Sequence, residues 1–342
     1  MLAGTSCTGR RKANPVTTGA PIRPVLVLAL PRSGSTLLQR LLASHPDVAT
    51  TPEPWLALAP IFALRTHGHA AYGQRTAARA VRDFCTHLPD GQATYLCATG
   101  RWLEHLYAAA ARGRPVFVDK TPRHYLIAAE LAQALPEARF VVLTRHPLAM
   151  VASIARTWKR GRLRLGSNAQ DVFEGPGALA DFLRRAPCAV HALRYEDLVA
   201  DTPARLAAAG AFLGLHEAPA WAAQARPVDL GGSMGDPTGA AAYGARVSTG
   251  SVDRWTRFYD SPLRRRFAQR YLHTLGADTL ATLGYADAAP PSGGGGGRYW
   301  LRDARDAGAD LPGLVLPGTW RFRRSFRRTG HRTRARFALR RA

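Results

Sequence analysis

The chain has 342 residues, enough for one large domain or two ordinary ones. Its 47 Lys and Arg outnumber its 24 Asp and Glu, and the formal net charge of +23 favours an anionic partner: a phosphorylated ligand, a nucleic acid or an anionic membrane surface. No apolar run is long enough to span a bilayer, and the four cysteines have neither metal-ligand spacing nor the density of a disulfide framework. We therefore expect a soluble, cytoplasmic protein without a metal site.

Short apolar segments alternate with helical patterns along the chain. Mostly apolar runs, typical of strands buried on both faces, occupy residues 25–30, 116–118, 140–143 and 189–193. Helical spacing of apolar residues appears over residues 37–42, 98–112, 126–135, 202–213 and 261–283. Strands that alternate with helices predict an α/β fold with a central parallel sheet flanked by helices.

Changes in composition divide the chain into four parts. Residues 1–22 are rich in Gly, Thr, Ala and Pro and predict a flexible arm, whereas residues 23–285 have the pattern of one globular domain. Residues 286–297 contain two prolines and five consecutive glycines, which predict a flexible linker. Residues 298–342 form an Arg-rich tail, for which we expect contact with an anionic surface.

The first predicted strand runs into a loop of small residues, and a helix is expected to begin near Thr36. The loop, residues 31–36, reads P-R-S-G-S-T. Backbone N–H groups at a helix N-terminus point toward an anion, and Gly34 allows the backbone to approach it closely. The pattern predicts a phosphate-binding loop, although on its own it also fits an ordinary strand-to-helix turn.

The loop differs from that of nucleoside triphosphatases, which reads G-x-x-x-x-G-K-[ST]. Ser35 follows Gly34 where that loop has its lysine, and Arg32 lies earlier in the loop. The lysine reaches the β- and γ-phosphates, so its absence favours a donor with less charge at that end than ATP.

Several stretches resemble the PAPS-dependent sulfotransferases, whose donor is 3′-phosphoadenosine-5′-phosphosulfate (PAPS). Residues 30–38 (L-P-R-S-G-S-T-L-L) are similar to the 5′-phosphosulfate loop of that family, above all of its bacterial and tyrosylprotein-type branches. Residues 119–122 (D-K-T-P), 143–147 (L-T-R-H-P) and 195–198 (Y-E-D-L) are similar to later family motifs. The resemblance covers about residues 23–283 and implies a P-loop-type three-layer fold.

The resemblance also implies roles for individual residues. Glu53, 21 residues after Arg32, would be the catalytic base, and Lys120 and Arg32 would stabilise charge on the transferring sulfonate. The residues that would bind PAPS are Arg32, Ser33, Gly34, Ser35, Thr36, Arg145, Ser153 and Tyr195. The loop residues would hold the 5′-phosphate, and Arg145 with Ser153 would hold the 3′-phosphate, without a metal.

Two positions depart from the family pattern. Some relatives have a further arginine one turn after the 3′-phosphate serine, where this chain has Thr157, and Arg156 or Lys159 are the candidates to replace it. Residues 250–255 resemble the late loop that covers the nucleotide, with Arg254 in place of a lysine.

The sequence therefore predicts a sulfotransferase that moves a sulfonate from PAPS to a hydroxyl of a small molecule, sugar or natural product. Trp55, Phe62 and Tyr72 are candidates to line the acceptor pocket, and for Phe62 the favoured role is packing in the core. Two alternatives remain at this point. A P-loop kinase of a small metabolite is opposed by the missing Gly-Lys pair, and a basic nucleic-acid-binding protein is suggested by the net charge and the tail.

Overall fold

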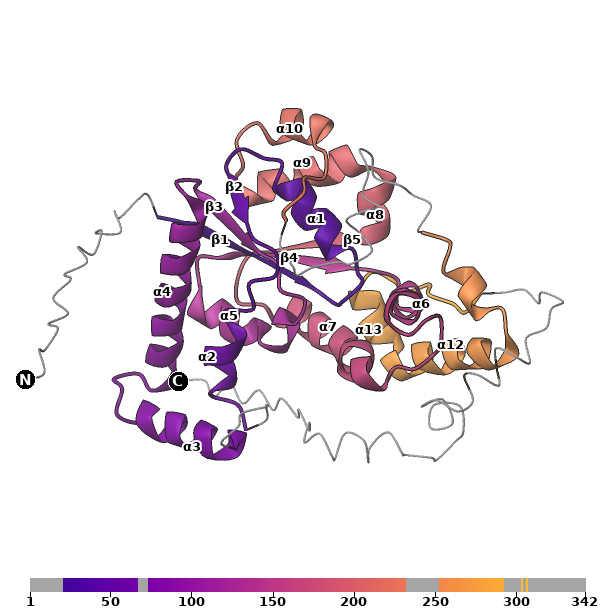
Figure 1. Cartoon of the computed structure of the whole chain (residues 1–342), viewed down its shortest axis with the longest axis horizontal. Coiled ribbons are helices and arrows are strands. Elements are labelled where there is room, and N and C mark those ends of the chain that lie inside the picture. Colours follow the sequence, from indigo (N-terminus) through magenta and orange to yellow (C-terminus); the bar gives the residue numbers. More distant parts are fainter. Residues whose placement is uncertain (1–20, 67–72, 232–251, 292–302, 304–305, 307–342) are drawn as a thin grey trace, which may run out of the picture.

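The computed structural model describes residues 21–66, 73–231 and 252–291, together with residues 303 and 306. Almost all of the predicted N-terminal arm, Tyr72 and most of the predicted tail lie outside these residues. Figure 1 shows a central sheet with helices on both of its faces.

The sheet has five strands in the order β2-β3-β1-β4-β5, and every neighbouring pair is parallel. The strands are β1 (Arg23–Ala29), β2 (Val48–Thr50), β3 (Val116–Asp119), β4 (Arg139–Thr144) and β5 (Val190–Arg194). This confirms the predicted α/β fold with a parallel sheet, and four of the five strands lie where apolar runs indicated them. No sequence pattern indicated β2, because its three residues are too few to form one.

Alternation along β1 shows why the central strands are apolar throughout. Leu26 and Leu28 pack on one face of the sheet and Val25 and Val27 on the other, and all four are buried. The first face is covered by α2, α4, α5, α6, α7, α12 and α13, and the second by α1, α8, α9 and α10 (Figure 1). Because helices cover both faces, each strand residue meets apolar neighbours whichever way it points.

The helices of the first half are α1 (Ser35–Leu42), α2 (Leu58–Phe62), α3 (Gln74–Cys85), α4 (Gln92–Ala111), α5 (Ala128–Ala134) and α6 (Pro147–Trp158). Those of the second half are α7 (Gly175–Arg185), α8 (Tyr195–Ala200), α9 (Thr202–Leu213), α10 (Ala218–Gln224), α12 (Pro262–Leu275) and α13 (Ala277–Thr282). Short 3-10 turns are η1 (His124–Leu126), η2 (Gly166–Asn168) and η5 (Thr256–Tyr259), and η3 (Gln170–Glu174) is a π-helical turn. The single helix predicted over residues 261–283 is two helices, because Gly276 adopts a φ of 80° and breaks it.

In a parallel sheet all carboxyl ends meet at one edge, and ligands of open α/β sheets bind there. The segment that directly follows each strand carries at least one residue singled out in the sequence. From β1 to β5, these segments contain Arg32, Glu53, Lys120, Arg145 and Tyr195. The fold therefore gathers the candidate site at one edge of the sheet.

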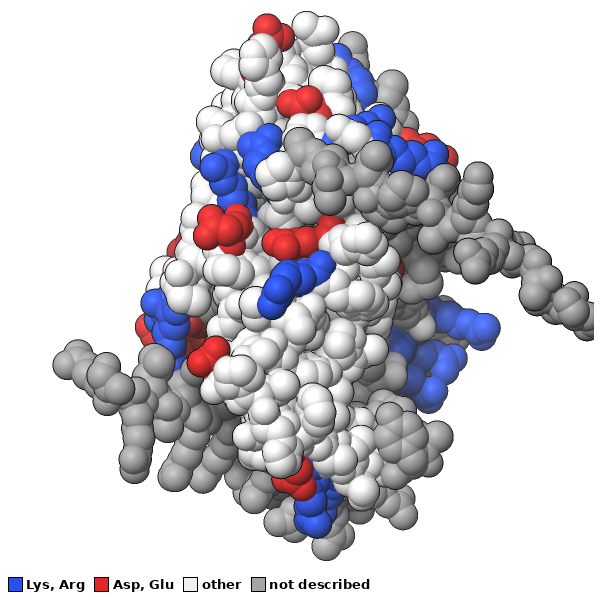
Figure 2. Space-filling view, turned by 90° about the vertical axis from the view of Figure 1, so that its left-hand side faces the viewer, with Lys and Arg blue, Asp and Glu red and all other residues white. Residues whose placement is uncertain are grey.

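Two further features bear on the predicted tail and on the net charge. Asp306, which lies in the segment predicted to be a tail, is fully buried and pairs with Arg264 of α12 at 2.7 Å. On the face shown in Figure 2, the charged side chains of the described residues lie around a broad uncharged area. Among the described helices, none has the length and apolar character needed to cross a membrane.

Candidate active site

The loop between β1 and α1 has the geometry of an anion cradle. Arg32 and Gly34 adopt φ values of 70° and 90°, and the Ser33 N–H donates to Leu30 O at 3.1 Å, which closes a tight turn before α1 begins at Ser35. Ser33 and Ser35 are both buried within this turn. Backbone N–H groups at the start of α1 are thus presented at the carboxyl end of β1.

Tyr195, at the start of α8, lies directly over this loop. A Cβ added to Gly34 would come within 2.3 Å of Tyr195 Cδ2, so the contact requires glycine at position 34 as much as the positive φ does. The Arg145 guanidinium stacks on the Tyr195 ring, with Cζ 4.4 Å from the ring centroid. Residues that follow β1, β4 and β5, and that were predicted to bind the nucleotide, therefore meet in one place.

Arg145 and Ser153 both contact Arg32. Arg145 Nη1 donates to Arg32 O at 2.9 Å, and Arg32 Nε donates to Ser153 Oγ at 3.3 Å. The Arg32 guanidinium also lies over the Trp158 ring at 5.7 Å. The structure thus places Arg32 with the residues predicted to hold the 3′-phosphate.

Further arginines converge on this group. Arg156 Nη1 donates to Arg254 O at 3.4 Å. Partial burial lowers the pKa of Arg156, and the positive charges of Arg145, Arg254 and Arg32 lower it further. Guanidinium groups whose charges oppose one another in this way would be stabilised by a multivalent anion bound among them. Lys159, the other candidate for this position, instead bonds to Ser167 Oγ.

Glu53 and Lys120 form a second group on the other side of the phosphate loop. Lys120 Nζ donates to Glu53 Oε1 at 2.7 Å and to Thr36 Oγ1 at 3.4 Å. The Lys120 side chain is 1% exposed and that of Glu53 is 12% exposed. Lys120 therefore links the first residues of α1 to the carboxylate that the sequence singled out as the base.

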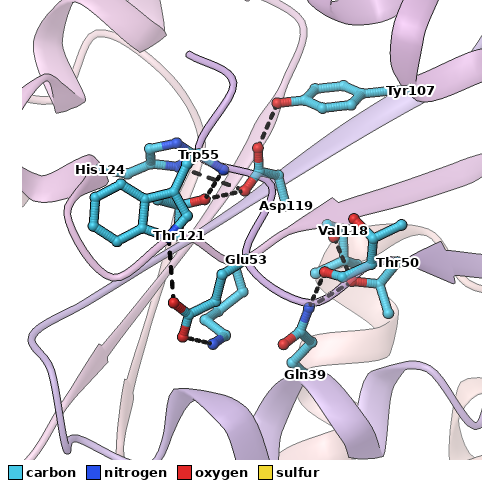
Figure 3. Close-up of polar contacts among 11 residues, drawn as sticks. Gln39, Thr50, Glu53, Trp55, Tyr107, Val118, Asp119, Thr121 and His124 are labelled. Carbon is cyan, nitrogen blue, oxygen red and sulfur yellow. Dashed lines mark hydrogen bonds and ion pairs between the residues drawn. The ribbon is translucent and has the colours of Figure 1, made fainter. Parts of the chain in front are cut away.

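Glu53 has a second partner on its other oxygen. Trp55 Nε1 donates to Glu53 Oε2 at 3.3 Å, and the Trp55 side chain is 38% exposed (Figure 3). Trp55 was predicted to line an acceptor pocket, and its indole lies beside the carboxylate. Phe62 is packed against the hydrophobic core, as the second of its two proposed roles requires.

The sequence reasoning overlooked residues that hold these side chains in place. Glu196 Oε1 accepts the His146 N–H at 3.0 Å, and its Oε2 accepts the Tyr285 hydroxyl at 2.6 Å. Because His146 follows Arg145 and Glu196 follows Tyr195, this carboxylate ties the two loops together. Glu196 is part of the Y-E-D-L motif, and its place there could have indicated a role in the site.

A second overlooked set lies around Asp119, directly before Lys120. Asp119 accepts hydrogen bonds from Tyr107 and Thr121, and His124 lies buried nearby (Figure 3). The D-K-T-P motif contains two of these residues, but only its lysine was assigned a role. No group of three or more His, Cys, Asp or Glu in the described part of the chain is arranged to hold a metal ion.

The fold and this site define a class: a P-loop-type α/β protein with an anion-cradle loop, an arginine cluster and a Glu–Lys ion pair at the carboxyl edge of its sheet. The family model described as "Sulfotransferase family" matches residues 24–219, more than half of the chain. Nodulation protein NoeE of Sinorhizobium fredii (strain NBRC 101917 / NGR234) is 30% identical over 328 residues, which cover 88% of this chain and 71% of NoeE. The chain belongs to the sulfotransferase family.

Solved structures agree with the fold. The sulfotransferase domain from the curacin biosynthetic pathway has a TM-score of 0.52 and 20% identity, and the match covers 80% of this chain and all of that domain. The sulfotransferase domain from the Synechococcus PCC 7002 olefin synthase has a TM-score of 0.53 and 20% identity, and the match covers 80% of this chain and 98% of that domain. Of the three functions that the sequence left open, family membership supports the sulfotransferase, an enzyme that takes its sulfonate from a donor molecule.

Proposed function

We propose that this sulfotransferase uses PAPS as its donor and transfers the sulfonate to a hydroxyl group, with Glu53 as the base. The observation that carries the proposal is the position of Lys120, which bonds both to Glu53 and to Thr36 of the phosphate loop. A charge-stabilising lysine between the donor loop and a carboxylate is the arrangement that an in-line transfer between two oxygens requires.

The proton and charge movements follow from this arrangement. The acceptor oxygen bonds to sulfur while the bond from sulfur to the bridging oxygen of the nucleotide breaks. Glu53 accepts the proton of the acceptor hydroxyl, so the acceptor leaves as a sulfate ester. Lys120 stabilises charge on the transferring group and on the departing oxygen. Arg32, whose guanidinium contacts Ser153, would add a second positive charge from the opposite side of the loop.

The remaining assignments concern the nucleotide. Loop amides with Ser33, Ser35 and Thr36 would hold the 5′-phosphate, and Gly34 would let the backbone approach it. Arg145 and Ser153 would hold the 3′-phosphate. The charges felt by Arg156 support adding Arg156 and Arg254 to that set. Of the two candidates to replace the arginine that is missing at Thr157, these contacts favour Arg156, because Lys159 bonds to Ser167.

The acceptor would bind on the open side of Glu53. The exposed indole of Trp55 supplies an apolar face directly beside the carboxylate, which suits a ring or another flat apolar surface. This supports a small molecule, a sugar or a natural product as the acceptor.

Two measurements test the donor. In EDTA, PAP (the product without sulfonate) at 100 times its Kd should stabilise the fold by about 2.7 kcal/mol, visible as a rise in Tm. ATP with Mg²⁺ should give a smaller shift, and stabilisation by ATP·Mg²⁺ alone would favour a kinase. Incubation with ³⁵S-PAPS and a small-molecule cell extract should then yield a labelled product, whose identification by mass spectrometry names the acceptor.

A further inference from the structure

The segment that carries Glu53 has an unfavourable backbone. Glu53 has a φ of 30° and Trp55 a φ of 58°, and neither is glycine. Pro54 lies between them and restricts the residue before it. Residues in such conformations are strained and persist only where their surroundings hold them. The structure shows what holds this segment on each side.

On the N-terminal side the anchor is Gln39 of α1. Gln39 Nε2 donates to Thr51 O at 2.9 Å and to Thr50 Oγ1 at 2.7 Å. Thr50 Oγ1 in turn donates to Val118 O of the neighbouring strand at 2.6 Å. The chain that enters the strained segment is therefore fixed to both α1 and β3.

On the C-terminal side the anchor is Thr121. The Trp55 N–H donates to Thr121 Oγ1 at 3.2 Å, and Thr121 Oγ1 donates to Asp119 Oδ1 at 2.9 Å. Tyr107 OH donates to Asp119 Oδ2 at 2.6 Å. Because a carboxylate only accepts hydrogen bonds, the Thr121 hydroxyl donates its single proton to Asp119. The lone pairs of the hydroxyl oxygen are then oriented to accept the Trp55 N–H.

The segment from Asp119 to Thr121 contacts Glu53 directly through Lys120 and indirectly through Trp55. Lys120, between Asp119 and Thr121, bonds to Glu53 Oε1, while the indole of Trp55 bonds to Oε2 (Figure 3). A shift of the Trp55 backbone would move the Glu53 carboxylate relative to Lys120. Asp119 and Thr121 are both fully buried, so water does not compete for these bonds.

We propose that Thr121, oriented by Asp119 and Tyr107, is a positioning residue that fixes the Glu53 carboxylate opposite Lys120. The inference rests on the proposed role of Glu53 as the base. It adds to that role the hydrogen bonds that hold the strained backbone next to the proposed base. At a reacting group, a displacement of about 1 Å is enough to lower the rate about 10²-fold.

The test compares T121V, which keeps the shape and removes the hydroxyl, with T121S, which retains it. The matched control is T99V, because buried Thr99 of α4 loses a comparable hydrogen bond, to Tyr95 O, remote from Glu53. Transfer from ³⁵S-PAPS to a small-molecule extract should fall about 10- to 100-fold in T121V and stay within about 3-fold of wild type in T121S and T99V. PAP affinity should change by less than about 3-fold in all three, because neither Thr121 nor Thr99 is among the residues proposed to contact the nucleotide.

Hydrogen exchange gives a readout that does not depend on transfer. The peptide covering residues 51–57 contains few amides, since two of its residues are prolines. Its Trp55 amide should exchange faster in T121V than in wild type, T121S or T99V. Unchanged exchange together with a wild-type transfer rate in T121V would overturn the proposal.

A double variant separates this proposal from the one on which it rests. If Thr121 acts through Glu53, T121V should lower the residual rate of E53Q by less than about 3-fold, far less than it lowers the wild-type rate. A full additional loss in E53Q would show that Thr121 acts elsewhere and would overturn the positioning role alone. Wild-type activity of E53Q itself would remove the base, and the positioning proposal with it.

Discussion

Lys120 Nζ lies 2.7 Å from Glu53 Oε1, and the pair joins the loops that follow the two strands at the β2 edge of the sheet. Both side chains are largely removed from water, so each needs the other for charge compensation. In the proposed reaction the lysine must nevertheless stabilise charge on the transferring sulfonate, and the carboxylate must be able to accept a proton. The site is therefore built around an ion pair whose partners have separate tasks in the proposed reaction.

The first prediction concerns the base. Glu53→Gln keeps the size of the side chain and its capacity to accept a bond from Lys120, but it removes the group that takes the proton. We expect kcat for transfer from ³⁵S-PAPS to fall about 10²- to 10⁴-fold, while PAP affinity by calorimetry stays within about 3-fold.

Glu130→Gln is the matched control for that variant. Glu130 of α5 also forms an ion pair, with Arg65, and it contacts none of the phosphate loop residues discussed above. It should transfer sulfonate at the wild-type rate. Equal activity of Glu53→Gln and Glu130→Gln would show that Glu53 is not the base.

The sequence was sufficient to predict much of the fold, and its motifs singled out residues that the structure brings to one edge of the sheet. Apolar runs predicted β1, β3 and β4, because strands covered on both faces have no polar side to interrupt them. The run at residues 189–193 also located β5, but β5 is an edge strand and only partly buried, so the expectation that it is covered on both faces was wrong. Arg32 and Gly34 were recognisable because a small-residue loop between a strand and a helix is a local sequence pattern typical of anion binding.

Other parts of the site depend on contacts between distant segments. Tyr107 lies on α4 and Asp119 at the end of β3, and nothing in either local pattern shows that they share a hydrogen bond. Thr121 was visible within a motif, but the strain at Glu53 and Trp55 that explains its role is a backbone property without a sequence signature. Asp306 follows a run of glycines that predicts a linker, so its burial against Arg264 was unexpected.

The second prediction concerns recognition of the 3′-phosphate. Arg145→Ala removes a guanidinium that stacks on Tyr195 and bonds to Arg32 O. Hydrogen bonds to charged groups contribute about 1.5–3 kcal/mol, so PAP affinity should fall about 10- to 100-fold. AMP lacks the 3′-phosphate, and its affinity should fall by less than about 3-fold in the same variant.

Lys159→Ala provides the control, since it removes a positive charge that follows α6 directly but contacts Ser167. Its affinities for PAP and AMP should both remain near the wild-type values in calorimetry. If Arg145→Ala weakened PAP and AMP to the same extent, Arg145 would serve the loop as a whole and not the 3′-phosphate.

The third prediction concerns pH and His124. Burial lowers the pKa of His124 below its ordinary value of 6.5, and the charge of Asp119 only partly opposes this. The folded state therefore keeps the ring neutral at pH values where the unfolded chain protonates it, so stability is lost as the pH falls below about 6.5. One such group costs up to about 1.4 kcal/mol between pH 6.5 and 5.5.

His124→Leu should remove this contribution. Neither ring nitrogen of His124 has a hydrogen-bond partner among the described residues, so an apolar side chain leaves no new polar group unsatisfied there. Urea unfolding should show that the variant loses about 1 kcal/mol less than wild type when the pH changes from 7.5 to 5.5. An identical loss in both proteins would mean that His124 titrates normally in the folded state.

The fourth prediction concerns Asp306 and the stability of the fold. Asp306 Oδ2 pairs with Arg264 Nε, and its Oδ1 accepts the Leu163 N–H at 3.0 Å. Arg264 further donates to Gly161 O at 2.7 Å and to Phe258 O at 3.2 Å. One carboxylate from beyond the glycine run thus joins α12 to the loop after α6, whose helix carries Ser153 and Arg156.

Asp306→Ala leaves the buried guanidinium of Arg264 without its counter-charge, which should reduce the free energy of unfolding by about 3–5 kcal/mol. Asp306→Asn keeps an oxygen for the Leu163 N–H and should lose less. A chain truncated after residue 291 should be destabilised at least as much as Asp306→Ala, because it lacks the same carboxylate. Urea unfolding of the three variants beside wild type measures the order. Wild-type stability of Asp306→Ala would show that this carboxylate does not hold α12 to the α6 loop in solution.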